Sequence, residues 1–483
     1  MSTIEIQNLI DGVWTGKPAT VRRNPADLDE IVTRTAAATA DEVRAAAASA
    51  AKAAQEWART PAPARGRILE RAGDLIEQRA DEIGDDITRE EGKTRAEARG
   101  EALRAAQLLR FYGNEGWRLG GETYPSAAGT DLIYSRREPL GVVSVITPWN
   151  FPIAIPTWKT APALIAGNAV LLKPAQVAPV GAWHLARALH DAGLPAGVLS
   201  LLNGSGSAVG NTLIDADEVA AVTFTGSNSV GDGIYRRAAP RRIRVQLEMG
   251  GKNAVIVLDD ADPQTAAEVV AAGAFGLTGQ ACTATSRVIV TPGIRDRFVE
   301  ALAAQAERYR PGNGLGDGVL MGPVVSHDQL SSNLDHLQAA VQAGARPVTD
   351  GRRVDGLMMA PSILTGVGPA DIIAREEVFG PVVAVLDAGG LDAAIDLVND
   401  SRFGLSAGIV TNDLAAVHRF ADRVHAGVVK VNRPTSGVEL NTPFGGVGDS
   451  GTNTYREQGQ GALDFFTWTK SVYSATPAWA ARP

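Results

Sequence analysis

From residue 141 onwards, short apolar runs rich in β-branched residues alternate with segments of helical periodicity. Predicted strands lie at 141–147, 169–172, 198–202 and 221–224. The segments between them, such as 183–192, are predicted to be helices. Such alternation is typical of a parallel sheet with crossover helices, which is the usual frame of a nucleotide-binding domain. The sequence therefore predicts an α/β fold.

A second stretch of the same kind follows the pair Gly250-Gly251, which we interpret as a hinge or domain boundary. Its predicted strands lie at 254–258, 287–291, 382–386 and 427–431. Because a chain of 483 residues is too long for one ordinary core, we expect two α/β domains.

The N-terminal part is predicted to begin with a hairpin and to continue as helices. Asp11-Gly12 separates two apolar pairs, which is a common hairpin signal. Thr39 and Glu42 form a predicted capping box at the start of an alanine-rich helix. Further helices are expected at about 64–90 and 94–112.

Composition argues against several classes of function. The chain has 45% hydrophobic and 21% charged residues, as a soluble globular protein does, and a net charge of −8. A negative charge without a local basic run gives no reason to expect nucleic acid or an anionic membrane as a partner. The N-terminus lacks the features of a signal peptide. The most apolar long stretch, 161–180, is interrupted by polar residues, so no membrane span is expected.

Cys282 is the only cysteine, so no intrachain disulfide can form, which fits a reducing cytoplasm. The six histidines lack metal-ligand spacing, so neither a metal site nor Ser-His chemistry is expected. A lone cysteine is usually a small buried hydrophobe. The segment 276–286 around Cys282 is instead polar and rich in turn residues, so the thiol could be approached. With an ordinary pKa of ~8.5, it would need a base or electropositive surroundings to react at neutral pH.

Glu248 and Asn150 are the candidate partners of this thiol. Glu248 stands where a strand meets a loop, so its side chain could face a cleft; the alternative is a surface glutamate. Asn150 lies in the loop 147–152, which prolines and aromatic residues would hold rigid. Its uncharged amide suits the stabilisation of an oxyanion. The alternative is a loop asparagine that bonds its own backbone.

Seven motifs stand in order along the chain: TPWNFP at 147–152, KPA at 173–175, FTGS at 224–227, LEMGGKN at 247–253, GQAC at 279–282, EEVFGP at 376–381 and PFGG at 443–446. With these motifs the chain resembles the aldehyde dehydrogenase superfamily over nearly its whole length. The resemblance implies a Rossmann-like NAD(P)-binding domain and an α/β catalytic domain, with a small β element for oligomerisation. We expect the first at 1–122 and 140–250, the second at 251–440, and the β element at 123–139 and 464–478.

By this resemblance, the thiolate of Cys282 attacks an aldehyde carbon, and the Asn150 amide and the Cys282 N–H hold the oxyanion. Hydride passes to the nicotinamide, and Glu248 activates the water that hydrolyses the thioester. Lys159 and Glu457 match family positions that support Glu248.

The cofactor implied is NAD(P), although the fingerprint GxGxxG is absent. The segment 225–231 resembles the family's turn beside the pyrophosphate, with Ser227 near a helix N-terminus. Gln176 stands where NAD-preferring relatives tend to carry a glutamate. A carboxylate about 4 Å from a 2′-phosphate would be repelled by ~4 kcal/mol. We therefore expect NADP, with NAD as a second candidate. The positions implied in cofactor binding are Ile146, Thr147, Pro148, Trp149, Lys173, Ala175, Gln176, Gly206, Gly210, Phe224, Thr225, Gly226, Ser227, Val230, Leu247, Glu248, Gly250, Glu377 and Phe379.

The segments 430–446 and 455–459 look more like those of α-ketoglutarate semialdehyde (2,5-dioxopentanoate) dehydrogenases than of betaine-aldehyde or general aliphatic enzymes. Arg433, with Thr435 beside it, is a candidate for holding a substrate carboxylate; a solvated arginine is an equal alternative. The second substrate class is an aromatic or aliphatic aldehyde, bounded by Trp149, Trp158 and Phe444.

Two other functions fit these residues less well. A CoA-acylating relative would lack the general-base glutamate, so Glu248 argues against that function. A catalytically idle homologue would not need all three of cysteine, asparagine and glutamate.

The predicted strands at 132–137 and 465–473 lie outside both sheets and resemble the family's subunit-pairing elements. A homodimer or homotetramer is therefore expected. The tail 474–483 resembles no feature that we recognise in the family.

Overall fold

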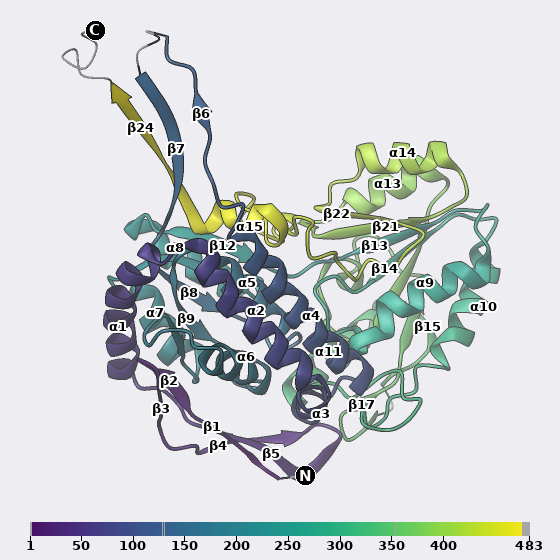
Figure 1. Ribbon diagram of the computed structural model, residues 1–483. Helices are drawn as coiled ribbons and strands as arrows, with labels where there is room; N and C mark the ends of the chain where they lie inside the picture. Colours follow the sequence, from purple (N-terminus) through teal and green to yellow (C-terminus); the bar gives the residue numbers. More distant parts are fainter. Residues whose placement is uncertain (1, 128, 130, 353, 476–483) are drawn as a thin grey trace.

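The computed structural model describes residues 2–127, 129, 131–352 and 354–475, and is built around two seven-stranded sheets (Figure 1). The first has the strand order β12-β11-β8-β9-β10-β2-β3. Its parallel strands are β8 (Val142–Ile146), β9 (Ala169–Lys173), β10 (Leu199–Leu201), β11 (Val219–Thr225) and β12 (Arg244–Glu248). The predicted hairpin, β2 (Asn8–Ile10) and β3 (Val13–Thr15), forms one edge. The four strands predicted here are therefore confirmed.

Alternate residues of β8 reach opposite faces of this sheet, as the twofold period of a strand requires. Val143 and Val145 belong to the core under one layer of helices, and Val142 and Ile146 to the core on the other face. The first layer holds α2 (Ala62–Gln78), α4 (Arg95–Glu115), α5 (Ala154–Ala166) and α6 (Val180–Asp191). The second holds α1 (Ala40–Arg59), α7 (Asn211–Asp215) and α8 (Asn228–Ala238).

The second sheet has the strand order β15-β18-β19-β14-β13-β21-β22 and is parallel except for β15 (Arg346–Thr349). Four of its strands, β13 (Ala254–Val257), β14 (Arg287–Val290), β19 (Val382–Asp387) and β22 (Val428–Val431), confirm the prediction. The other two are β18 (Ser362–Thr365) and β21 (Ser406–Val410). One face packs on α9 (Pro263–Phe275) and α10 (Arg295–Ala306). The opposite core includes α11 (His327–Gln342), α13 (Leu391–Asn399) and α14 (Leu414–Arg423).

The structure corrects three predictions made from the sequence. The helix expected at about 64–90 is two helices, because the backbone leaves the helical conformation at Arg79 (φ −104°, ψ 14°) and α3 (Ala80–Glu91) starts anew. Phe465 lies in α15 (Gly459–Phe466) rather than in a strand. β18 and β21 were missed because their runs, SILT and SAGIV, are short and only partly apolar. Within the described residues, no helix is both long and apolar enough to cross a bilayer.

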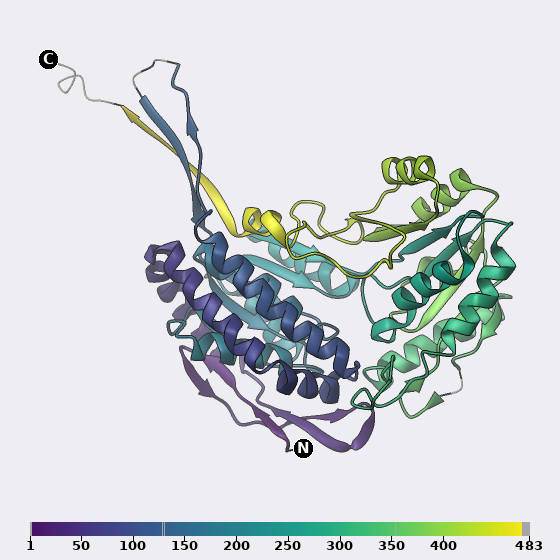
Figure 2. The same cartoon turned by 45° about the vertical axis from the view of Figure 1, so that its right-hand side comes forward.

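Three strands leave the body of the molecule as an arm (Figures 1 and 2). The long pair β7 (Asp131–Pro139) and β24 (Thr467–Ala475) is antiparallel, and β6 (Thr123–Tyr124) pairs with the other side of β7. These strands confirm the extended segments predicted near 132–137 and, from Thr467 onwards, 465–473, which pair with each other. Residues 476–478 of the expected β element, and 476–483 of the tail, lie outside the described residues.

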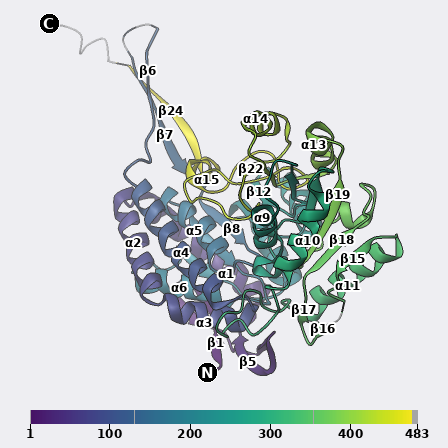
Figure 3. The ribbon, with the colours of Figure 1, turned by 90° about the vertical axis from the view of Figure 1, so that its right-hand side faces the viewer.

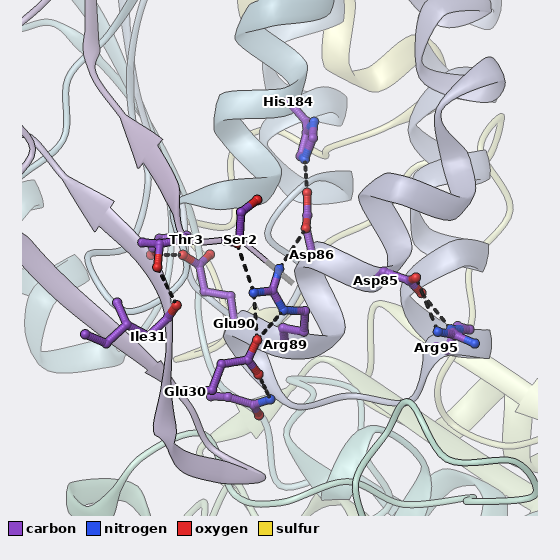
Figure 4. A network of polar contacts seen from close by, with 12 residues as sticks. Ser2, Thr3, Glu30, Ile31, Asp85, Asp86, Arg89, Glu90, Arg95 and His184 are labelled. Atoms are coloured by element: carbon purple, nitrogen blue, oxygen red, sulfur yellow. Dashed lines mark hydrogen bonds and ion pairs between the residues drawn. The ribbon is translucent and has the colours of Figure 1, made fainter.

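A small N-terminal sheet, which the sequence did not reveal, lies at the opposite end from the arm (Figure 3). Its strands are β1 (Ile4–Ile6), β4 (Thr20–Asn24) and β5 (Asp27–Thr35). Polar contacts join it to α3, and α3 in turn to α6 (Figure 4). Arg89 pairs with Glu30 at 2.7 Å, and Glu90 accepts from Thr33 Oγ1 at 2.6 Å and from the Val180 N–H at 2.7 Å.

Candidate active site

The loop that carries Cys282 begins with a strained backbone. After α9, Leu277 and Thr278 adopt left-handed φ values of 54° and 57°, and Gly279 follows at 65°. Such values are unfavourable for residues with a Cβ, so surrounding contacts must hold them. The Thr278 hydroxyl donates to the Gly322 carbonyl at 3.1 Å, and Gln280 Oε1 accepts from the Val325 N–H at 2.9 Å. These contacts hold the strained turn just before Cys282.

The motif LEMGGKN holds this loop from the other side. The Asn253 amide donates to the carbonyls of Cys282 and Ala284 at 2.8 and 2.9 Å, and its oxygen accepts from the Ser406 N–H at 3.0 Å. A Cβ on Gly251 would lie 2.9 Å from the Cys282 carbonyl oxygen, so the close approach needs a glycine. In the described part of the chain, the Cys282 backbone N–H has no hydrogen-bond partner.

Cys282 lies between two cavities and lines both. The larger, about 470 Å³, is mainly apolar, with Phe151, Trp158 and Phe444 in its wall. The rings of Trp158 and Phe444 pack with centroids 5.9 Å apart. The smaller, about 250 Å³, is lined on one side by the loop after β8 and on the other by Glu377 and neighbouring residues. A molecule in either cavity can therefore approach the same sulfur atom.

Asn150 reaches the cysteine loop and lies in the wall of the smaller cavity. Its Nδ2 donates to the Gln280 carbonyl at 2.9 Å, which leaves the second N–H of the amide for another acceptor. The buried Lys93 ammonium donates to the Asn150 carbonyl and to Glu101, both at 2.6 Å. The other Glu101 oxygen accepts from the Ile153 and Ala154 N–H groups. The Lys93–Glu101 pair therefore fixes the loop that carries Asn150.

Glu248 ends β12, and its buried carboxylate accepts from the Gly446 N–H at 3.3 Å. Burial, together with the nearby charge of Glu457, raises its pKa well above the ordinary value. Lys159 pairs with Glu457 and donates to Thr223 Oγ1 at 2.8 Å. The structure thus brings Glu248, Lys159 and Glu457 together. Glu248 is absent from the described linings of both cavities, so its carboxylate faces the glycine loop 445–446 rather than the open space.

The surroundings of Cys282 favour the protonated thiol. Burial raises its pKa, and the negative charges of Glu377, Glu248 and Glu457 add to that effect. The Thr283 N–H acts in the opposite direction. Activation of the sulfur therefore requires a base, or a cation that offsets these carboxylates.

Glu377 and Phe379 form the far wall of the smaller cavity. Glu377 Oε1 accepts from the Gly251 N–H at 3.0 Å, and burial raises the pKa of this carboxyl to about 7. A Cβ on Gly250 would lie 2.1 Å from the second Glu377 oxygen, so only glycine leaves room for it. The ring of Phe379 meets Trp149 edge-on, with centroids 5.4 Å apart.

Comparison with known proteins identifies the family to which a chain with this site belongs. Residues 14–472 match the aldehyde dehydrogenase family. The chain belongs to this family. It is 45% identical to the alpha-ketoglutarate semialdehyde dehydrogenase of Haloferax volcanii, over 97% of this chain and 99% of the relative. The alpha-ketoglutaric semialdehyde dehydrogenase of Bacillus subtilis is 44% identical, over 96% and 97%. The solved NAD-dependent aldehyde dehydrogenase of Sinorhizobium meliloti superposes with a TM-score of 0.95 at 34% identity, covering 100% of this chain and 96% of that one.

As an aldehyde dehydrogenase, the protein needs room for NAD or NADP, and the smaller cavity fits the reactive end of this cofactor. The Glu377 carboxylate suits ribose hydroxyls, which need hydrogen-bond acceptors, and Gly250 leaves the room that this carboxylate occupies. Of the positions expected to bind it, the structure brings eight to this cavity: Pro148, Trp149, Thr225, Gly226, Ser227, Gly250, Glu377 and Phe379. Its lining also includes Met249 and Val378, which lie in the motifs LEMGGKN and EEVFGP but were not singled out, and Gln329 and Ser332, for which no sequence signal stood out.

The other expected cofactor residues of this dehydrogenase are not in the lining of that cavity. They are Ile146, Thr147, Lys173, Ala175, Gln176, Gly206, Gly210, Phe224, Val230, Leu247 and Glu248. Lys173 and Gly210 form a second group, because a Cβ on Gly210 would lie 3.7 Å from Lys173 Cδ. Lys173 is buried, which lowers its pKa to about 8, and Gln176 is exposed.

Two expected substrate residues of this dehydrogenase do not line the larger cavity. Arg433 is exposed on the protein surface. Thr435 is buried, but its hydroxyl donates to the Thr283 carbonyl at 2.7 Å and lies 2.8 Å from Thr285 Oγ1, so it anchors the cysteine loop. The cavity instead includes Arg104 on α4, which the sequence did not single out. Its spacing from Glu97 and Glu101 on a predicted helix was the available signal.

Proposed function

We propose that Cys282 is the nucleophile of an oxidation that converts an aldehyde, water and NAD(P)⁺ into a carboxylic acid, NAD(P)H and a proton. The observation that carries this proposal is the position of Cys282, in the wall of both cavities. The aldehyde would enter the larger cavity and the nicotinamide the smaller one. The sulfur would then form a bond to the aldehyde carbon, with the new oxyanion facing the Asn150 amide and the Cys282 N–H.

NAD(P) would supply the hydride acceptor, held by the residues of the smaller cavity. Loss of hydride leaves the acyl group on Cys282 as a thioester. We propose that Glu248 then turns from the glycine loop 445–446 toward Cys282 and takes a proton from the attacking water. Its raised pKa makes the ionised carboxylate a stronger proton acceptor than an ordinary glutamate. Lys159 and Glu457 are proposed as its positioning residues, because they pair with each other and their charges act on the buried Glu248 carboxylate.

The proposed substrate is α-ketoglutarate semialdehyde, and the product α-ketoglutarate. Two relatives with 45% and 44% identity over nearly the whole chain carry that substrate in their names. The alternative is an aromatic or aliphatic aldehyde, which the apolar wall of Phe151, Trp158 and Phe444 favours. A panel of 2,5-dioxopentanoate, succinate semialdehyde, benzaldehyde and pentanal, followed by NAD(P)H absorbance, tests the proposal. A higher kcat/KM for benzaldehyde or pentanal than for 2,5-dioxopentanoate contradicts it.

NADP is the proposed cofactor within the pair used by the family. Gln176 carries no charge that would repel a 2′-phosphate, and Lys173 stands three residues before it. The test compares kcat/KM for NADP and NAD in the wild type and in Gln176→Glu. A wild-type preference for NAD above about tenfold contradicts this proposal, and Gln176→Glu is expected to shift the ratio toward NAD.

We also propose the domain boundaries stated above and an oligomer, a homodimer or homotetramer, assembled through the arm. The arm exposes large hydrophobic side chains, with Leu132 59% and Tyr473 72% accessible, which would be unfavourable in an isolated subunit. Light scattering after size exclusion measures the mass, and a monomer at micromolar concentration contradicts the proposal. A cytoplasmic location is proposed because the free thiol of Cys282 must stay reduced to act.

A further inference from the structure

Three charged side chains of α4 line the larger cavity. Glu97, Glu101 and Arg104 follow one another at spacings of four and three residues, so they share one face of the helix. Hydrogen bonds at both ends join this face to the half of the molecule that contains the second sheet. Glu97 accepts from the Leu277 N–H at 2.8 Å, and Arg104 donates to the Val438 carbonyl at 2.6 Å. Figure 1 shows α4 among the helices that adjoin that half.

The two carboxylates already have partners. Glu101 is paired with Lys93 and accepts from two backbone N–H groups, as described above. Glu97 accepts from the backbone and hydroxyl of Thr94 with one oxygen and from Leu277 with the other. Both side chains therefore have structural roles, in the loop before α5 and at the start of α4.

Arg104 has fewer hydrogen-bond partners than the two glutamates. Among the described residues that line this cavity, it is the one cationic side chain, and the hydrogen bond to Val438 is the one that its guanidinium makes within the described structure. A guanidinium has five N–H donors in a planar fork, so most of them remain for a ligand. Burial lowers the pKa of Arg104, and the opposing charge of Glu439 does not restore it. Among the described residues, Arg104 forms no ion pair with a carboxylate, so no direct partner within the protein neutralises its charge.

The remaining wall of the cavity determines what kind of anion fits. Phe151, Trp158 and Phe444 are apolar, and Cys282 lies in the same wall. The cavity therefore suits a ligand with two different ends. An electrophilic carbon at one end would meet the Cys282 sulfur, an anionic group at the other end would meet Arg104, and the carbon chain between them would contact the aromatic rings. In such a partly desolvated site, a charge-assisted pair is stronger than in water.

We infer that Arg104 binds the terminal carboxylate of the substrate through its free N–H groups, and so selects ω-carboxylate aldehydes over neutral ones. This inference rests on the proposed oxidation of α-ketoglutarate semialdehyde. It assigns to Arg104 the role of binding the substrate carboxylate, which the sequence suggested for Arg433. Arg433 is exposed and lies outside the cavity. Arg104 is a specificity-determining residue in this account, because it contacts the end of the substrate that does not react.

The test is steady-state kinetics of three variants with 2,5-dioxopentanoate and with pentanal, which has five carbons and no carboxylate. Arg104→Gln keeps a donor for the Val438 carbonyl but loses the charge, Arg104→Lys keeps the charge, and Arg104→Leu loses both. We expect Arg104→Gln and Arg104→Leu to lower kcat/KM for 2,5-dioxopentanoate by about ten- to a hundredfold, mostly through KM. Arg104→Lys should retain more of it, and pentanal oxidation should change by less than about threefold.

Arg433→Leu is the matched control, since it removes an exposed arginine outside the cavity and should leave both substrates unaffected. An equal loss on both substrates in Arg104→Gln would show that Arg104 only supports the fold, and an unchanged KM for 2,5-dioxopentanoate would show that another group binds the carboxylate. Either result overturns the inference. The proposed function fails separately, if the wild type does not prefer 2,5-dioxopentanoate.

Discussion

The Lys93 ammonium donates a hydrogen bond of 2.6 Å to the backbone carbonyl of Asn150, so the buried Lys93–Glu101 ion pair holds the residue that carries the proposed oxyanion donor. Lys93 and Glu101 are 1% and 4% exposed at their side chains. Carboxylates raise the pKa of Lys93 despite its burial, with Glu101 the largest contributor. The charge on Lys93 is therefore compensated inside the protein.

Replacement of Lys93 by methionine is expected to destabilise the protein by about 3–5 kcal/mol, because it leaves the Glu101 carboxylate buried without a counter-charge. Urea unfolding measures the change. The double variant Lys93→Met/Glu101→Gln should recover part of the loss, since the buried charge is then gone. A loss below about 1 kcal/mol in the single variant would show that water or another group compensates Glu101.

Asn150→Ala should lower kcat by about 10²–10³-fold, since it removes one of the two proposed donors to the oxyanion. Steady-state NAD(P)H formation gives kcat, and alkylation of Cys282 by iodoacetamide in the same variant serves as the control. Alkylation has no oxyanion, so its rate should stay within about threefold of wild type. If both rates fall together, Asn150 acts on the cysteine loop rather than on the reaction.

The raised pKa of Cys282 predicts that alkylation accelerates with pH. A thiol whose pKa lies above its ordinary value is mostly protonated at neutral pH, so the reactive thiolate increases from about pH 6 to pH 9 without a plateau. Glu377→Gln removes a negative charge and should lower the thiol pKa, which raises the rate at about pH 7. Glu376→Gln, at the neighbouring residue that pairs with Arg402, is the matched control. A plateau already reached below about pH 7 would disprove a raised pKa.

Gly250→Ala should weaken cofactor binding, because the added Cβ would lie 2.1 Å from a Glu377 oxygen and displace that carboxylate. The expected effect is an increase in KM for NAD(P) of more than about tenfold, because the displaced carboxylate can no longer accept from the ribose hydroxyls. Gly233→Ala, in α8, is the control, since a Cβ there meets nothing within 4 Å and alanine favours a helix. Equal KM values for the two variants would rule out Glu377 as the group that binds the ribose.

Strong local patterns in the sequence predicted much of the fold. The strand at 169–172 and the capping box at Thr39 were confirmed, because both depend on neighbouring residues alone. β21 was missed, since SAGIV is only partly apolar and is a strand because it pairs with β13 and β22 on either side. The interruption at Arg79 was missed for a similar reason, since the helical periodicity continues across it.

Ordered motifs and local patterns were enough to predict the family, the α/β class, and Cys282, Asn150 and Glu248 as candidate site residues. The packing of distant segments set the surroundings of these residues. It placed Cys282 between two cavities, turned Glu248 toward the glycine loop 445–446, and brought Arg104 rather than Arg433 to the larger cavity. Burial, charge and access arise only when distant segments pack together, so no local pattern in the chain records them.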